Sequence, residues 1–176
     1  MSDELVPEMF DRWQKGTGHI FQELERLKAL VDPFHLGETA GVSILAAGAA
    51  RVGFTPVTEV VLRKSKIDQL GNGLSWNGRN DLMISAEGAN YMFEFKLCWQ
   101  DASDKQIEEC LVLASDDAAC LPSNLCTGRY GGIVSSYTCE AAQNRYRNFE
   151  KAADKIIVSN DGASEGLAFL FRKVAS

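Results

Sequence analysis

Three ionisable residues lie close together in the stretch RNDLMISAEGANYMFEFKLCWQ, which runs from Arg79 to Gln100. They are Asp81, Glu94 and Lys96, and all three have strongly apolar neighbours. Two adjacent carboxylates can share a divalent metal ion through oxygen ligands. Such an ion lowers the pKa of bound water and polarises a phosphoryl oxygen, and a nearby ammonium stabilises developing negative charge. These residue types therefore suit metal-assisted hydrolysis of a phosphate ester.

The same stretch has the alternating pattern of a β-hairpin. One face is predicted to be buried, because its side chains are all apolar: Leu82, Ile84, Ala86, Tyr91, Phe93, Phe95 and Leu97. The opposite face then carries the three ionisable residues. An odd-length turn would instead put Asp81 on the apolar face, which is costly.

A two-residue turn at Gly88 and Ala89 predicts the pairing of the two strands. Met83 would then face Glu94, and Asp81 would face Lys96. Opposite residues in such a pair have Cβ atoms about 5 Å apart, and diagonal residues about 7–8 Å. Asp81, Glu94 and Lys96 are therefore expected on one small patch. The backbone carbonyl of Phe95 is a further candidate metal ligand.

This arrangement resembles the PD-(D/E)xK nuclease superfamily, which has the restriction-endonuclease-like fold. The resemblance rests on Asp81 and on Glu94-Phe95-Lys96, and it covers roughly residues 37–140. The first motif reads Asn80-Asp81 where the family name has Pro-Asp. The resemblance implies a three-layer α/β domain with a mixed central sheet flanked by helices. It also implies Mg²⁺ or Mn²⁺ as cofactor, DNA as substrate, and a homodimer in which each subunit cuts one strand.

Members of that superfamily often place one more acid on the helix before the strands, and Glu38 matches this position. Glu38, Val42 and Leu45 lie on one helical stripe, so Glu38 is predicted to point towards the sheet. The alternative is that Glu38 only interacts with the helix dipole, and Glu59 competes for the same role. Gln100 is a candidate for contact with substrate or metal-bound water, or else a loop residue without a role.

A group of basic residues lies near this predicted site. Arg63, Lys64 and Lys66 are close in sequence, and Arg79 flanks Asp81. Ammonium and guanidinium groups hold phosphates as point charges or as bidentate forks. These side chains are therefore candidates for binding the DNA backbone. The alternative is a basic loop on an acidic protein.

The helices and strands predicted around these residues indicate a single domain over residues 1–176. We expect an N-terminal helical extension over residues 1–36 and a nuclease-like core over residues 37–176. Gly16 and Gly18 are expected to break the first helical region. The predicted helices are 3–31, 37–53, 101–121 and 140–158, the last with a short strand at its end. The predicted strands are 55–64, the hairpin strands within 79–100, 131–139 and 166–174, and a loop is expected over 70–78.

Composition limits the classes of function. The chain has 176 residues, 45% hydrophobic and 24% charged, as in a soluble globular domain. No apolar run is long enough to span a membrane, and the acidic N-terminus is unlike a signal peptide. Five cysteines without a CxxC pair and only two histidines do not favour a zinc site. A cytoplasmic protein with reduced thiols is expected.

Two other functions stay open. The net charge of −6 opposes nucleic-acid binding by the average surface. An inactive domain of the same fold, binding a protein partner as an immunity or anti-defence factor does, would agree with that charge. A plain structural protein is the third reading, in which Asp81 and Lys96 form a surface pair worth about 0.2–1 kcal/mol.

Overall fold

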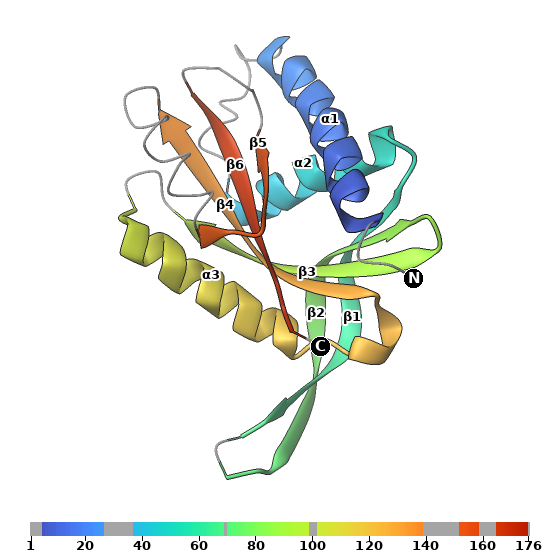
Figure 1. The fold of residues 1–176 in the computed structure, drawn as a ribbon, viewed down its shortest axis with the longest axis vertical. Coiled ribbons are helices and arrows are strands. Elements are labelled where there is room, and N and C mark those ends of the chain that lie inside the picture. Colours follow the sequence, from blue (N-terminus) through green and yellow to red (C-terminus); the bar gives the residue numbers. More distant parts are fainter. Residues whose placement is uncertain are drawn as a thin grey trace.

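The structure is a computed structural model that describes residues 5–26, 37–68, 70–98, 102–138, 152–158 and 165–175. Its centre is a six-stranded sheet in the order β1-β2-β3-β4-β6-β5, with helices on both faces (Figure 1). Strands β3 and β4 are parallel, and every other neighbouring pair is antiparallel. The predicted α/β class, with a mixed sheet between helices, is confirmed at this level.

The order of the elements follows the prediction closely. Helices α1 (Leu5–Arg26) and α2 (Glu38–Arg51) precede three consecutive strands, which are β1 (Thr55–Ile67), β2 (Gly73–Ala86) and β3 (Ala89–Cys98). The chain continues through α3 (Asp104–Ala119), a 3₁₀ turn (Ser123–Leu125), β4 (Gly128–Thr138), β5 (Lys155–Val158) and β6 (Glu165–Lys173). Residues 140–151 of the predicted fourth helical region lie outside the described residues, and the short strand expected at its end is β5.

Both faces of the central strands are buried, because α1 and α2 cover one face and α3 covers the other. This explains why the centre of β6, from Leu167 to Phe171, is a continuous apolar run. The larger core lies under α1 and α2 and includes Phe10, Trp13, Leu45, Leu82, Phe93, Phe95, Tyr130 and Phe171. The core under α3 includes Cys98, Ile107, Leu111, Ile133 and Leu170, beside a smaller cluster around Met92, Ala118 and Leu121.

The expected break at Gly16 and Gly18 is wrong, because α1 is continuous from Leu5 to Arg26. Gly16 instead permits close contact with α2. A Cβ atom on Gly16 would lie 2.1 Å from the carbonyl oxygen of Gly48, whereas a Cβ atom on Gly18 would meet nothing within 4 Å. The first glycine is thus explained by helix packing rather than by a turn.

The hairpin register differs from the prediction by two residues. The turn is formed by Glu87 and Gly88, whose φ angles of 53° and 80° are those of a type I′ turn. Met83 therefore faces Met92, and the predicted pairs of Met83 with Glu94 and Asp81 with Lys96 are wrong. An even shift preserves the alternation, so the predicted apolar face is buried as expected.

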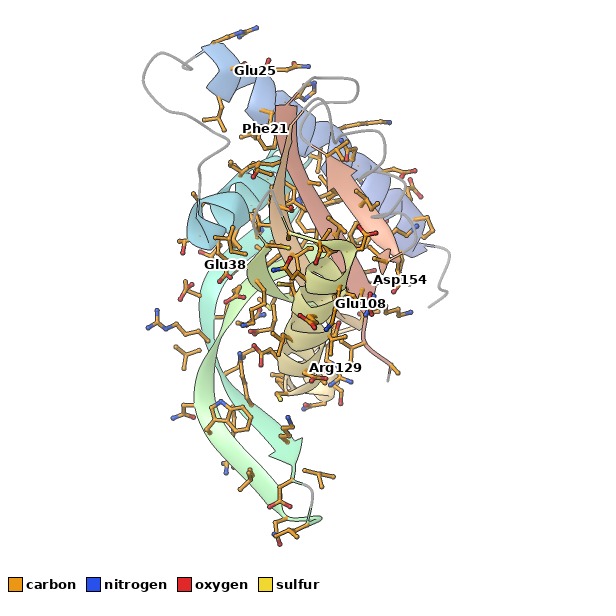
Figure 2. The ribbon with its side chains drawn as sticks, turned by 90° about the vertical axis from the view of Figure 1, so that its left-hand side faces the viewer. Phe21, Glu25, Glu38, Glu108, Arg129 and Asp154 are labelled. Carbon is orange, nitrogen blue, oxygen red and sulfur yellow. The ribbon has the colours of Figure 1, made fainter. Side chains whose placement is uncertain are left out.

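Strands β1 and β2 extend well beyond the rest of the sheet as a two-stranded ribbon (Figures 1 and 2). Residues Val61–Ile67 pair with Gly73–Arg79. The loop predicted over residues 70–78 is therefore mostly wrong, since β2 already begins at Gly73. Its glycines and asparagines gave the segment a loop-like composition, but their backbone groups pair with β1. Among the described residues, no helix is long and apolar enough to cross a membrane.

Candidate functional site

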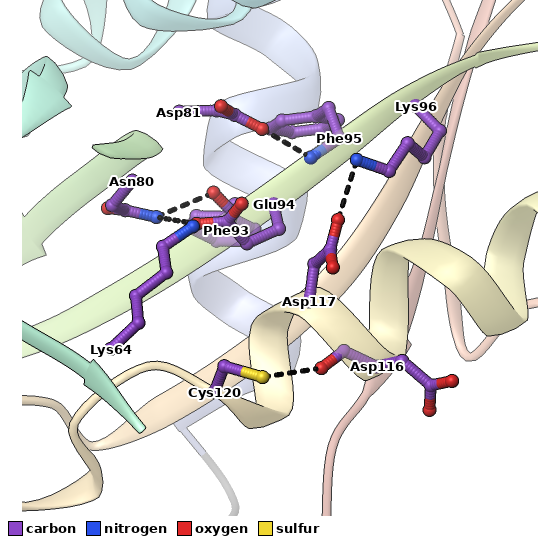
Figure 3. A network of polar contacts seen from close by, with 10 residues as sticks. All are labelled: Lys64, Asn80, Asp81, Phe93, Glu94, Phe95, Lys96, Asp116, Asp117 and Cys120. Carbon is purple, nitrogen blue, oxygen red and sulfur yellow. Dashed lines mark hydrogen bonds and ion pairs between the residues drawn. The ribbon is translucent and has the colours of Figure 1, made fainter. Parts of the chain in front are cut away.

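The candidate site lies where β2 parts from β3. Their regular pairing ends at Leu82 and Phe93, because β2 continues along β1 into the ribbon. Beyond this point, side chains of β2 form the hydrogen bonds to the backbone of β3 that strand pairing would otherwise supply. Asn80 Nδ2 donates to the carbonyl oxygen of Phe93 at 2.7 Å, and the amide of Phe95 donates to Asp81 Oδ2 at 2.7 Å (Figure 3). Asp81 is thus held against the backbone of β3 rather than opposite Lys96.

Helix α2 contributes the next contact along the same edge of β3. The amide of Leu97 donates to Glu38 Oε2 at 2.9 Å. Glu38 is in the first turn of α2, while Val42 and Leu45 on the same stripe are buried in the core. The prediction that Glu38 points towards the sheet is therefore confirmed. Its role in catalysis stays a prediction.

Glu94 is buried on the α3 side of the sheet, and its partner comes from the ribbon. Lys64 Nζ on β1 lies 2.8 Å from Glu94 Oε1, and Asn80 Nδ2 lies 3.4 Å from the same oxygen. The side chain of Lys64 is only 11% exposed. The Lys64 ammonium is thus engaged with Glu94 in this structure, and its expected contact with substrate phosphate stays a prediction.

Lys96 forms an ion pair with Asp117 near the end of α3, with Nζ and Oδ2 separated by 2.6 Å (Figure 3). Both side chains are partly exposed. Burial lowers the pKa of Lys96, but the hydrogen bond and charge of Asp117 outweigh this and leave the pKa raised. Lys96 is therefore a stable cation at neutral pH.

The three carboxyl groups influence one another electrostatically. Burial raises the pKa of Glu94 to about 7; the hydrogen bond from Lys64 opposes this shift, and the charge of Asp81 adds to it. Burial also raises the pKa of Asp81, against the Phe95 amide and the charges of Lys64 and Lys96. Burial and then Asp81 raise the pKa of Glu38. Burial is therefore the main reason that these carboxyl groups resist ionisation, and the charge of Asp81 adds to the effect at Glu94 and Glu38.

Each of these carboxylates keeps one oxygen atom free. Asp81 Oδ1, Glu94 Oε2 and Glu38 Oε1 have no hydrogen-bond partner among the described residues, whereas the other oxygen of each is bound. A pocket of about 50 Å³ adjoins Asp81 and Glu38 and is also lined by Thr39, Val42, Ser43, Thr58 and Glu59. It can hold one or two water molecules. Glu59, the competing candidate, thus shares a pocket with Glu38.

The oxygen ligands of the site suit magnesium better than a metal that needs a complete cage of protein ligands. Among the residues that the structure describes, no three His, Cys, Asp or Glu side chains gather closely enough to enclose an ion. Magnesium does not need such a cage, because it usually keeps several waters and binds one or two carboxylates plus substrate phosphate. The free oxygens of Asp81 and Glu94, with the carbonyl of Phe95, fit that mode.

The remaining predicted substrate-binding residues are spread along the ribbon. Arg79 is exposed and pairs with Glu59 at 2.8 Å. Lys66 is exposed and lies further out on β1. Gln100 lies outside the described residues.

Sequence reasoning missed one residue of the site, Asp117, and did not foresee that Lys64 pairs with Glu94. The role of Lys64 as the partner of Glu94 has no local signal, because the two are separated by 30 residues. Asp117 did have a signal. Asp116 and Asp117 occupy the last turn of α3, where carboxylates oppose the helix dipole, so a nearby cation was to be expected.

Comparisons with protein-family models, with curated proteins and with solved structures found no match to this chain.

Proposed function

We propose that this protein is a metal-dependent nuclease that hydrolyses DNA phosphodiester bonds at the site formed by Asp81, Glu94 and Lys96. The observation that carries the proposal is that Asp81 lies close enough to Glu94 and to Glu38 to influence the charge of each, with the Lys96 ammonium nearby. Each of these carboxylates keeps one oxygen free of hydrogen bonds among the described residues. Burial is the main cause that raises the pKa values of all three carboxyl groups, and a divalent cation bound beside them would favour their charged forms.

The arrangement of the elements supports a restriction-endonuclease-like fold. The order α2-β1-β2-β3-α3-β4 matches that fold, with an antiparallel meander followed by a helix and a strand parallel to β3. The acid of the first motif lies on β2, and the Glu-x-Lys motif lies on β3. The further acid of the family corresponds to Glu38 on α2.

The residues divide the chemistry between them. Asp81, Glu94 and the carbonyl of Phe95 would hold Mg²⁺, which when bound activates water and polarises the scissile phosphate. Lys96, kept charged by Asp117, stabilises the negative charge that develops on the phosphoryl oxygens. A cationic Lys96 does not fit removal of a proton from water, so we assign it charge stabilisation. Glu38 orients the backbone of β3 through the Leu97 amide.

Cleavage of DNA tests this proposal. Purified protein should nick or cut plasmid DNA with Mg²⁺ or Mn²⁺ and lose this activity in chelator. Glu94→Gln and Lys96→Gln should each lower the rate roughly 100-fold or more. Lys105→Gln is the matched control, because Lys105 is an exposed lysine on α3. Equal rates for Glu94→Gln and wild type would refute the assignment.

A second function has one specific observation in its favour. The Lys64 ammonium already occupies one oxygen of Glu94, and the carboxylates of Asp81 and Glu38 replace strand pairing for β3. An inactive domain of the same fold that binds a protein partner needs only these structural roles. In that case Mn²⁺ would leave the unfolding temperature unchanged, and no metal would support cleavage.

A further inference from the structure

We propose that the ribbon formed by β1 and β2 is a docking arm for duplex nucleic acid. The arm comprises residues 60–68 and 70–80. This inference rests on the proposed nuclease function, and it identifies how the substrate reaches the site.

The arm is the basic part of an acidic protein. It carries Arg63, Lys64, Lys66 and Arg79 but only one acid, Asp68, which gives it a net charge of +3. The remainder of the chain therefore carries −9, since the total is −6. Phosphate contacts supply most of the non-specific affinity for nucleic acid. Lys64 is buried against Glu94 and Arg79 pairs with Glu59, so Arg63 and Lys66 are the cations of the arm that remain available to a polyanion.

Basic side chains are present on both faces of the arm. The register pairs Val61 with Arg79 and Arg63 with Asn77, so the two arginines share one face. Lys66 lies on the opposite face, opposite Leu74. Within the part of the chain that the structure describes, neither Arg63 nor Lys66 pairs with a carboxylate. A ribbon with cations on both faces can reach the phosphates on both walls of a groove.

The dimensions of the arm suit a groove. Seven consecutive pairs extend from Val61–Arg79 to Ile67–Gly73, which is about 23 Å at roughly 3.3 Å per residue. The major groove of B-DNA admits a two-stranded β-ribbon. Apolar side chains are also exposed along the arm; Ile67 is 73% and Leu70 86% exposed, and Trp76 is exposed as well. Such side chains can contact bases or thymine methyl groups.

The arm leads directly into the candidate site. Asn80 and Asp81 lie at its base on β2, and Lys64 on β1 contacts Glu94. The amide of Ser65 also donates to the carbonyl of Cys120 at 2.9 Å, which anchors the arm to the end of α3. A duplex lying along the arm would therefore bring its backbone to Asp81. In Figure 2 the arm projects beyond the sheet, and its residues 65–67 and 73–74 line a pocket with Asp116, Ala119 and Cys120 at the end of α3.

Binding can be measured without any chemistry. Fluorescence anisotropy of a labelled 20-base-pair duplex in EDTA should show binding that weakens with salt. The double variant Arg63→Gln/Lys66→Gln should weaken binding at least tenfold and lower the slope of log K against log salt by about 2. The control Arg26→Gln/Lys105→Gln removes the same charge from exposed residues of α1 and α3 and should bind as wild type.

Tryptophan fluorescence locates the contact and checks the fold. Duplex should quench wild-type emission. Trp76→Phe should lose most of this quenching, whereas Trp99→Phe, which removes the third tryptophan of the chain, should keep it, and Trp13 stays buried. Equal affinities for the arm and control variants would overturn the proposal. So would a dimer in sedimentation that dissociates in Ile67→Ser, because the arm would then bind a second copy of the chain. Arm-dependent binding without cleavage would refute only the nuclease activity, and cleavage that ignores the arm variants would refute only the docking arm.

Discussion

At the scale of single residues, the site contains four carboxylates and two lysines, since Asp117 accompanies Asp81, Glu94 and Glu38. Lys64 neutralises Glu94 from β1, and Lys96 is held by Asp117 from α3. The two ion pairs differ in surroundings, because the first is buried and the second is half exposed. Changes to the Lys64–Glu94 pair should therefore alter stability and metal affinity. Changes to the Lys96–Asp117 pair should mainly alter the catalytic rate.

The pKa of Glu94 predicts a dependence of stability on pH. Its folded-state pKa of about 7 lies above its ordinary 4.5, so the folded protein holds this proton more tightly than the unfolded chain. The resulting stability is fully present below pH 4.5 and is lost as the pH rises through 7. The loss amounts to about 3 kcal/mol. Urea unfolding in chelator should show this slope in wild type and not in Glu94→Gln. Parallel curves for the two proteins would contradict the assignment.

Replacing Lys64 by methionine should have opposite effects on the free protein and on its affinity for metal. The change preserves much of the side-chain volume but leaves Glu94 buried without its partner, which costs about 3 kcal/mol at pH 8. It also removes a competing cation, so Mn²⁺ affinity should rise about tenfold or more. Thermal unfolding with and without Mn²⁺ and calorimetry measure the two effects. Unchanged Mn²⁺ affinity would show that Lys64 and the metal do not share Glu94.

Asp117 should act as a positioning residue for Lys96. Asp117→Asn weakens the ion pair, so the cleavage rate should fall about tenfold. The Michaelis constant for DNA and the Mn²⁺ affinity should stay within about twofold, because Asp117 binds neither. Asp116→Asn is the matched control, since Asp116 points away from Lys96 (Figure 3). Rescue of the rate by Asp117→Glu would separate positioning from a general structural effect.

At the scale of elements, the contact between α1 and α2 depends on a glycine. Gly16→Ala should lower the free energy of unfolding by about 1–3 kcal/mol, because the new methyl group would overlap the backbone of Gly48. Gly18→Ala, two residues along the same helix, has open space and should stabilise the protein by about 0.5–1 kcal/mol. Denaturant unfolding compares the two. Equal destabilisation by both alanines would contradict this account of the helix contact.

The elements were predictable where periodicity was strong. The amphipathic pattern of α1 and the alternation of β3 gave the right elements, and α3 begins with the capping box of Ser103 and Gln106 that its sequence contains. The register of the hairpin was not predictable, because Glu87 adopts a positive φ that glutamate rarely takes. The outer half of β2 was not predicted as a strand, because the composition around Gly73 and Gly78 is typical of a loop.

Only part of the candidate site could be predicted from the sequence. The proximity of Asp81 to β3 followed from the alternation of the hairpin. Its contact with the Phe95 amide did not, because this depends on β2 leaving β3 after Leu82. The Lys64–Glu94 pair depends on the positions of β1 and β3 on either side of β2. No local sequence pattern specifies these positions.

At the scale of the whole molecule, charge is divided between the body and the arm. The body carries −9 and the arm +3, so a polyanion is repelled by most of the surface and attracted by one projection. The carboxylates of the candidate site lie at the base of that projection. A divalent cation bound to these carboxylates would neutralise them and so allow a polyanion on the arm to approach the site.

Binding of Mn²⁺ tests the central claim most directly. Calorimetric titration at pH 8 should show one Mn²⁺ per chain, with affinity lowered at least tenfold in Asp81→Asn and unchanged in Glu109→Gln, an exposed acid on α3. Absence of binding heat, or equal affinity in wild type and Asp81→Asn, would contradict the account.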